Sequence, residues 1–186
     1  MHEIVVCPLI EIERIETGPV ELSGYDWLVL TSGTGARELR GRAVGRARRV
    51  AAIGRATAKE WGKVDLVPAV STQEGLLAEL PRPAGRVLFA GAKGARRLLV
   101  DELGADFLAL YGTRPLRPAE PVHGDLVVLA SASAARSFAE LGLAIPAVSI
   151  GPETTVAAEA AGVRVLQEAR THDLEGLVGA VALVSG

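Results

Sequence analysis

A single α/β pattern occurs twice in this chain, and the repeat limits the possible folds more than any other feature. Residues 25–39 read YDWLVLTSGTGAREL, and residues 124–138 read GDLVVLASASAARSF. Each copy has an aspartate, an apolar run, a small polar loop with serine, and the start of an arginine-bearing helix. Two further blocks recur at nearly the same spacing, VAAIGRATAK with AVSIGPETTVA and TQEGLLAEL with DLEGLVGAV. Such repetition predicts two similar structural units.

Short apolar runs alternate with helix-forming stretches along the chain. The runs are flanked by Gly, Pro or small polar residues, which is typical of buried parallel strands. This alternation predicts an α/β fold of right-handed βαβ units, with helices on both faces of each sheet. We expect strands at residues 28–30, 50–53, 64–67, 87–90, 107–110, 126–130, 147–150 and 163–166. We expect helices at residues 34–39, 57–61, 72–80, 95–103, 134–141, 154–161 and 174–183.

A fourth, weaker pair of segments suggests how the two lobes connect. Residues 3–13 and 106–116 are both extended, apolar and interrupted by proline, which limits pairing to an edge or a strand end. We interpret both as crossing strands that run side by side as a two-strand linker. One lobe then comprises residues 18–112, and the other comprises residues 1–15 plus 116–186, with a cleft between the lobes. The discontinuous lobe is expected to have four strands, against five in the continuous lobe.

Hydroxyl residues and glycines follow the expected strands, at the edge where parallel sheets bind ligands. One interpretation is helix N-capping, because Ser and Thr satisfy free amides at helix starts. The other is a joint anion site, because helix N-termini offer free N–H groups and partial positive charge. The candidate substrate-binding residues are Thr31, Ser32, Gly33, Gly54, Thr57, Lys93, Ser131, Ser133, Gly151 and Thr154.

Basic residues gather in the continuous lobe, in an arginine-rich stretch from Arg37 to Arg55 and at Lys93. This pattern fits either a solvated helix face or electrostatic attraction of a polyanionic substrate. Tyr111 ends a crossing strand at the expected cleft, where its phenol can donate a proton. A packing role in the cleft wall is the alternative for Tyr111.

Several classes of function are disfavoured. The net charge of −2 argues against a protein dedicated to nucleic acid. His2, His123 and His172 lack metal-ligand spacing, so we expect no metal site. The single cysteine, Cys7, allows no intramolecular disulfide. Neither a membrane-spanning stretch nor a signal peptide is evident, and we therefore expect a cytoplasmic location.

The ordered blocks YDWLVLTSGTGAR, VAAIGRATA, STQEGLL, LYGTRPL, AVSIGPETT and DLEGLV resemble the uroporphyrinogen-III synthase family. The resemblance covers nearly the whole chain and implies two α/β lobes joined by a two-strand ladder. It also implies the substrate hydroxymethylbilane, a linear tetrapyrrole with eight carboxylates. The enzyme would remove its hydroxyl as water, invert the last pyrrole ring through a spiro intermediate and close the macrocycle, without a cofactor.

By the same resemblance, Tyr111 matches the family's cleft tyrosine and would assist departure of the hydroxyl. Thr57 and Thr154 match the threonines of two helix starts, while Ser32, Ser131 and Ser133 match the serine loops. The resemblance implies a further strand and helix at the start, which this sequence does not show. Either a neighbouring chain covers the gap, or the chain is a trimmed natural variant, or its start is misassigned. We expect a monomer, or a dimer if a neighbouring chain covers the incomplete lobe. The alternative function is a non-catalytic binding protein for a carboxylated small molecule.

Overall fold

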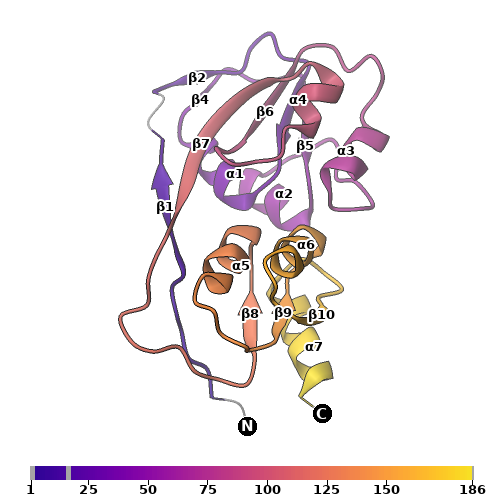
Figure 1. Ribbon diagram of the computed structural model, residues 1–186. Helices are drawn as coiled ribbons and strands as arrows, with labels where there is room; N and C mark the ends of the chain where they lie inside the picture. Colours follow the sequence, from indigo (N-terminus) through magenta and orange to yellow (C-terminus); the bar gives the residue numbers. More distant parts are fainter. Residues whose placement is uncertain (1–2, 16–17, 186) are drawn as a thin grey trace. The chain divides into compact units, whose positions relative to one another are not determined.

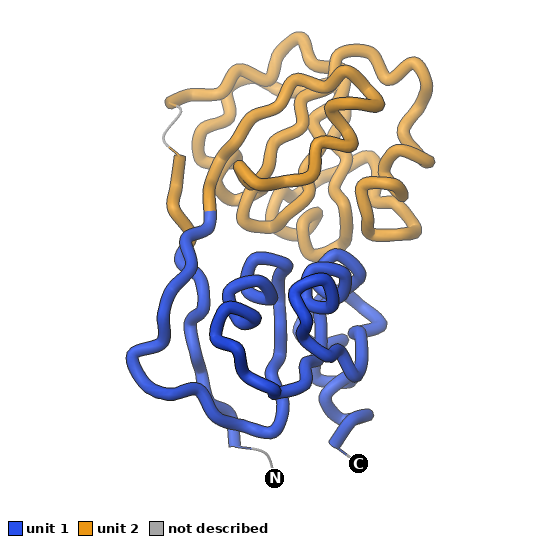
Figure 2. Tube along the Cα trace, in the orientation of Figure 1, with its two compact units in different colours: residues 1–11, 113–186 blue, residues 12–112 orange. Residues whose placement is uncertain are grey.

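The chain divides into two compact units in the computed structural model, which describes residues 3–15 and 18–185. Unit 1 comprises residues 1–11 and 113–186, and unit 2 comprises residues 12–112, as coloured in Figure 2. Each unit has the expected mixed α/β fold, in which helices flank parallel strands. The lobe boundaries expected from sequence, and the cleft between the lobes, stay predictions.

Unit 2 is built on four parallel strands, which Figure 1 labels β3, β5, β6 and β7. The carboxyl ends of neighbouring strands lie level, since Leu30 of β3 is paired with both Ala52 of β5 and Ala90 of β6. The strand order is β1-β7-β6-β3-β5, with β1 Ile10–Arg14, β3 Trp27–Leu30, β5 Arg49–Ala52, β6 Val87–Ala92 and β7 Asp106–Pro115.

The edge strand β1 runs antiparallel to β7. The Ile15 N–H donates to the Leu110 carbonyl at 3.0 Å, and the Leu116 N–H donates to the Leu9 carbonyl at 2.8 Å. We expected four strands in the discontinuous lobe, and that prediction is wrong: the described part of unit 1 has a sheet of three strands, and residues 3–9 form no strand. In unit 2, β6 joins β7 to β3, whereas the described part of unit 1 has no counterpart of β6 with which these residues can pair.

The strands of unit 2 alternate in the direction of their side chains, so both faces of the sheet are apolar. Leu28 and Leu30 pack on one face together with Ala36 of α1 (Gly33–Arg40) and Trp61 of α2 (Arg55–Trp61). On the other face, the core includes Trp27, Val29 and Phe89 of the sheet and two helical leucines. These are Leu76 of α3 (Gln73–Glu79) and Leu99 of α4 (Leu98–Leu103).

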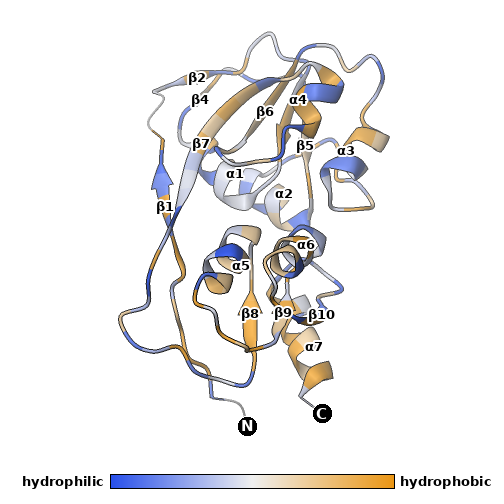
Figure 3. Ribbon diagram, viewed as in Figure 1, coloured by the Kyte–Doolittle hydropathy of each residue, from blue (hydrophilic) through white to orange (hydrophobic). Residues whose placement is uncertain are grey.

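Unit 1 repeats this plan with three parallel strands in the order β10-β9-β8. Phe138 of α5 and Ala158 of α6 pack with Leu129 and Ala147 on one face, and Leu177 of α7 packs with Val148 on the other. Figure 3 shows β8, β9 and most of α7 in hydrophobic colours. The elements are β8 Val127–Leu129, α5 Ala132–Ala139, β9 Ala147–Ser149, α6 Pro152–Ala160, β10 Val165–Glu168 and α7 Leu174–Val184.

The expected strand at residues 64–67 is reduced to an isolated parallel bridge between Leu66 and Ala51. The reason lies in its neighbours. The Asp65 side chain accepts the Val50 N–H at 2.8 Å, which ends the pairing before Arg49, and Pro68 has no N–H to extend it. A two-stranded parallel sheet of β2 (Val20–Glu21) and β4 (Ala43–Val44) was not expected.

All of the expected helices are present in the described chain, with ends shifted by a few residues. Within residues 3–15 and 18–185, we find no helix long and apolar enough to cross a bilayer.

Candidate functional site

The helices that follow the strands begin in the same way in both units. The first and third helix of each repeat start on a polar N-cap whose oxygen accepts an amide hydrogen, and these caps are Ser32, Thr72, Ser131 and Asp173. The second helix of each repeat starts on a glycine, Gly54 or Gly151, without a side-chain cap. The capping interpretation is therefore confirmed for Ser32 and Ser131, and α2 and α6 begin with uncapped first turns.

At the carboxyl end of β3, the loop of Thr31, Ser32 and Gly33 leads directly into α1. The Ser32 Oγ accepts the Gly35 N–H at 3.0 Å. A Cβ added at Gly91 of β6 would lie 3.2 Å from the Thr31 Oγ1, so the loop lies against the end of the neighbouring strand. These three predicted residues are half-buried and lie together at the sheet edge.

Tyr111 reaches this loop because β7 has an irregular register. Gly91 is paired with Ala109, but the next residue of β6, Ala92, is paired with Tyr111, so Leu110 is an extra residue on β7. Consecutive residues of a regular strand face opposite sides, yet Leu110 and Tyr111 both pack in the core beneath α1. A bulge re-aims side chains in this way, and here it turns Tyr111 toward Ser32.

The Tyr111 hydroxyl donates a hydrogen bond to the Ser32 Oγ at 2.9 Å, and the tyrosine is only 8% exposed. Burial raises the pKa of the Tyr111 phenol above its ordinary value of 10.0, while the Ser32 hydrogen bond and the charge of Arg37 act in the opposite direction. The phenol is thus neutral at physiological pH and able to donate a proton.

Lys93 lies beside Tyr111 through its backbone. Its N–H donates to the Tyr111 carbonyl at 2.7 Å, and its side chain is exposed. Gly54 follows β5 on the same edge of the sheet, and Thr57 in the first turn of α2 is buried. Unit 2 therefore brings Tyr111, Ser32 and Lys93 together, with Gly54 and Thr57 at the same edge, beyond the end of β5.

The corresponding edge of unit 1 carries the remaining predicted residues. The Ser131 Oγ accepts the Ala134 N–H at 3.1 Å and lies 3.1 Å from the Ser133 Oγ. Gly151 and Thr154 at the start of α6 are both buried. A Cβ at Gly151 would lie 2.9 Å from the His172 Cδ2, which brings His172 to this helix start.

Sequence reasoning missed a chain of polar groups next to these residues. The Thr155 Oγ1 donates to a Glu168 carboxylate oxygen and lies 2.6 Å from the fully buried Ser149 Oγ. The available signal was the position of Ser149 and Glu168 at the ends of adjacent parallel strands, where polar residues are unusual in a buried sheet.

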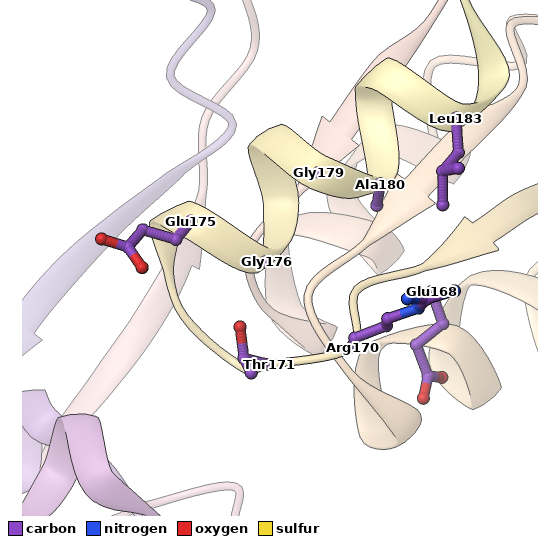
Figure 4. A pocket seen from close by; sticks show the side chains of 8 residues that line it. All are labelled: Glu168, Arg170, Thr171, Glu175, Gly176, Gly179, Ala180 and Leu183. Carbon is purple, nitrogen blue, oxygen red and sulfur yellow. The ribbon is translucent and has the colours of Figure 1, made fainter.

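Glu168 also lines a pocket of about 350 Å³, which residues at and after the end of β10 form together with α7. Figure 4 shows Glu168 and Arg170 near the strand end, and Glu175, Gly176, Gly179, Ala180 and Leu183 along α7. His123 and His172 belong to no cluster that can hold a metal among the described residues, and His2 lies outside them.

Most of the arginine-rich stretch of unit 2 is engaged within its own unit. Arg37 pairs with Glu60 at 3.0 Å, Arg48 pairs with Asp26 at 3.2 Å, and Arg49 stacks on the Trp27 ring. Arg55 is exposed in the first turn of α2. The stretch is thus largely a solvated, internally paired surface, and attraction of a polyanion stays a prediction.

These features describe an α/β protein in which a buried phenol of unit 2 lies beside a polar strand-end loop. The chain matches the family described as uroporphyrinogen-III synthase HemD over residues 2–179. A curated relative, the uroporphyrinogen-III synthase of Synechococcus elongatus, is 24% identical, with 93% of this chain and 84% of the relative aligned. The chain therefore belongs to the uroporphyrinogen-III synthase family, enzymes of tetrapyrrole biosynthesis that act on a small-molecule substrate.

Solved structures support the fold. The uroporphyrinogen-III synthetase of Helicobacter pylori superposes with a TM-score of 0.65 at 18% identity, covering 100% of this chain and 97% of that one. A mutant uroporphyrinogen III synthase of Thermus thermophilus gives a TM-score of 0.63 at 18% identity, covering 98% and 90% respectively. At this identity, the likeness bears on the fold alone.

Proposed function

We propose that this protein is a cyclising lyase that converts hydroxymethylbilane to uroporphyrinogen III with loss of water and inversion of the last pyrrole ring. The observation that carries the proposal is the buried Tyr111 phenol, held 2.9 Å from Ser32 at the carboxyl end of the unit 2 sheet. The reaction breaks a carbon–oxygen bond without hydrolysis or oxidation, and a residue that protonates the departing hydroxyl is the main chemical requirement.

Tyr111 supplies that proton. The phenolic proton passes to the substrate hydroxyl as the carbon–oxygen bond breaks, and the bonding electron pair leaves with the oxygen as water. The substituted α-carbon of the last pyrrole attacks the resulting cationic centre, which gives the spiro intermediate. The older bond from this carbon to its methylene bridge then breaks, and the methylene bonds to the free α-carbon of the same pyrrole, so that the ring is inverted. The free α-carbon finally loses its proton, and the proton returns to the Tyr111 phenolate. The cycle balances without a cofactor, and most of the remaining acceleration comes from positioning the flexible chain.

The carboxylates of the substrate bind at the strand ends. In unit 2, the exposed Lys93 and Arg55 contribute positive charge, and the uncapped first turn of α2 contributes amide donors. In unit 1, Ser131, Ser133 and the start of α6 at Gly151 contribute a second set of donors. Partial charge at helix starts adds to both sets, typically about 0.3–1 kcal/mol for each well-placed anion.

The test is to supply freshly prepared hydroxymethylbilane and analyse the isomers of uroporphyrinogen by chromatography after oxidation. We expect the type III isomer from the wild-type protein. Tyr111→Phe should reduce turnover by a factor of about 10²–10⁴, the usual contribution of a general acid. Tyr25→Phe is the matched control, because the Tyr25 hydroxyl lies at the other end of the same sheet and bonds to Asp106 at 2.9 Å.

If the protein binds hydroxymethylbilane but only the spontaneously closed type I isomer forms, the catalytic proposal fails. That result would favour a non-catalytic binding protein for a carboxylated small molecule. Unchanged turnover in Tyr111→Phe, with the type III isomer still formed, would remove Tyr111 from the mechanism and leave the reaction in place.

A further inference from the structure

The Ser32 hydroxyl is fully used as an acceptor. It accepts the Tyr111 O–H at 2.9 Å and the Gly35 N–H at 3.0 Å. A serine oxygen has two acceptor lone pairs and one hydrogen of its own. Both acceptor positions are therefore filled, and the Ser32 hydrogen is the one remaining hydrogen-bonding capacity of this group.

Both partners are held by packing that leaves little freedom. Ser32 has the extended backbone of an N-cap residue and precedes α1, whose Ala36 and Leu39 are fully buried. A Cβ added at Gly35 would lie only 3.0 Å from the Ser32 Oγ, so the helix backbone closes tightly over the hydroxyl. The Tyr111 ring is fixed in the same core by the extra residue Leu110.

The pair has no counterpart in the other repeat. Ser131 is the equivalent N-cap, but its hydroxyl neighbour is Ser133 at 3.1 Å. The residue that matches Tyr111 in the repeated crossing segment is Pro8, which has neither a hydroxyl nor an N–H. A link between an N-cap serine and a phenol is therefore specific to unit 2 within the described chain.

We propose that Ser32 is the positioning residue for the Tyr111 phenol, accepting its hydrogen at rest and donating its own hydrogen to the phenolate after proton transfer. The second half of this proposal rests on the proposed function, in which Tyr111 gives its proton to the departing hydroxyl. The exchange needs rotation of two hydroxyl hydrogens, because the two oxygens are already within hydrogen-bond distance. The Tyr111 O–H turns from Ser32 to the substrate hydroxyl, and the Ser32 O–H turns to the Tyr111 oxygen. No further acid, base or cofactor enters, and the proton lost on ring closure restores the starting arrangement.

The energetic reason is that a buried phenolate is costly unless it is hydrogen-bonded. Burial raises the pKa of Tyr111, and the hydrogen bond with Ser32 is the largest effect that lowers it again. A hydrogen bond to an ionised acceptor is roughly twice as strong as one between neutral groups. Ser32 therefore stabilises the phenolate more than the phenol, which eases release of the proton.

The test titrates Tyr111 directly and does not depend on turnover. The chain has only two tyrosines, Tyr25 and Tyr111, so Tyr25→Phe leaves Tyr111 as the single signal in NMR of protein labelled with ¹³C at the tyrosine ring carbon that bears oxygen. In this background, Ser32→Gly removes the hydroxyl but keeps a residue well suited to an N-cap. Two helices of this protein already begin on glycine.

We expect Ser32→Gly to move the Tyr111 titration to higher pH, and Ser32→Thr, which keeps the hydroxyl, to restore it. Ser131→Gly removes the equivalent cap of unit 1 and should leave the Tyr111 titration where it was. If Ser32 served only as the N-cap of α1, the pH midpoint of the Tyr111 titration would be the same in all of these variants. Circular dichroism across the same pH range shows that each variant remains folded, and the comparison of Ser32→Thr with wild type stands even if Ser32→Gly does not fold.

Measurements of turnover provide a second test of the role of Ser32. Ser32→Gly should lower kcat about tenfold, the value expected for loss of one hydrogen bond of about 1.4 kcal/mol, and should shift the alkaline limb of the pH–rate profile. If the Tyr111 titration is the same in Ser32→Gly and wild type while the wild type forms the type III isomer, the positioning proposal is overturned and the proposed function stands. If the titration moves but no variant forms that isomer, the proposed function fails and the resting Ser32–Tyr111 pair stands.

Discussion

Two glycines in α7, three residues apart, should respond in opposite ways to replacement by alanine. Gly176 lies in the first turn, where its N–H donates to the Asp173 Oδ1 at 2.8 Å. A Cβ at Gly176 would lie 1.9 Å from the Thr171 carbonyl oxygen, whereas a Cβ at Gly179 would meet no atom within 4 Å. Neither glycine has a positive φ. Backbone strain is therefore equal in the two variants, and only the available space differs.

Replacement of glycine by alanine inside a helix stabilises by about 0.5–1 kcal/mol, because alanine loses less backbone entropy on folding. Gly179→Ala should show this gain in full. Gly176→Ala has the same gain but forces the chain at Thr171 to move, and overpacking of this kind costs about 1–3 kcal/mol. The difference between the two free energies of unfolding isolates the clash, so we expect Gly179→Ala to be the more stable variant by about 1–3 kcal/mol.

The assay is urea unfolding followed by far-ultraviolet circular dichroism, with the slope against urea checked for each variant. Gly75 in α3 provides a repeat of the experiment, since its Cβ would lie 2.0 Å from the Val70 carbonyl oxygen. The two tryptophans, Trp27 and Trp61, both belong to unit 2, so fluorescence follows the Gly75→Ala variant. Equal stability of Gly176→Ala and Gly179→Ala would refute the argument that close approach by Thr171 requires glycine.

Two further predictions concern helix starts and acid stability. Ser131→Ala removes the N-cap of α5 and should lower the free energy of unfolding by about 1 kcal/mol, with Ser131→Thr recovering most of the loss in the same urea assay. Glu74 is held by two hydrogen bonds from Arg96, at 2.7 and 3.0 Å, and this pairing lowers the pKa of Glu74 from 4.5 to about 2. A depressed carboxyl pKa stabilises the folded state above pH 4.5, and that contribution is lost as the pH falls toward about 2. The stability of Glu74→Gln should therefore depend less on pH across this window, and an identical acid limb in thermal unfolding would contradict this assignment.

The repeat made the helices, their order and most of the strands predictable, because local signals agree with the fold at those positions. Ser32 and Ser131 lie between an apolar run and the small residues that begin a helix, which is the usual position of a hydroxyl N-cap. The sequence repeat pairs Gly75 with Gly176, but it does not show why glycine is required at these two positions. Each approaches a carbonyl oxygen five residues earlier, and only the folded turn shows that contact.

The sequence signal was insufficient where pairing depends on residues far along the chain. Residues 64–67 have a strand-like composition, yet a side chain of the same segment, Asp65, takes the neighbouring amide. The extra residue Leu110 has no local signature, because the bulge is defined by the register of β7 against β6. Without the bulge, Tyr111 would face away from Ser32, and strict alternation along the strand would have predicted that wrong orientation.

The two repeats differ at the residue to which we assign the proton transfer. Each unit offers hydroxyl and amide donors at its strand ends, through Ser32 and Gly54 in one and Ser131 and Gly151 in the other. Among the described residues, only unit 2 contains the strand pair β6–β7, whose bulge presents Tyr111. Under the proposed function, duplication of the scaffold supplies the proposed anion-binding groups twice and the proposed proton donor once. This difference between the units fits the proposed substrate, which has many carboxylates and a single hydroxyl to lose.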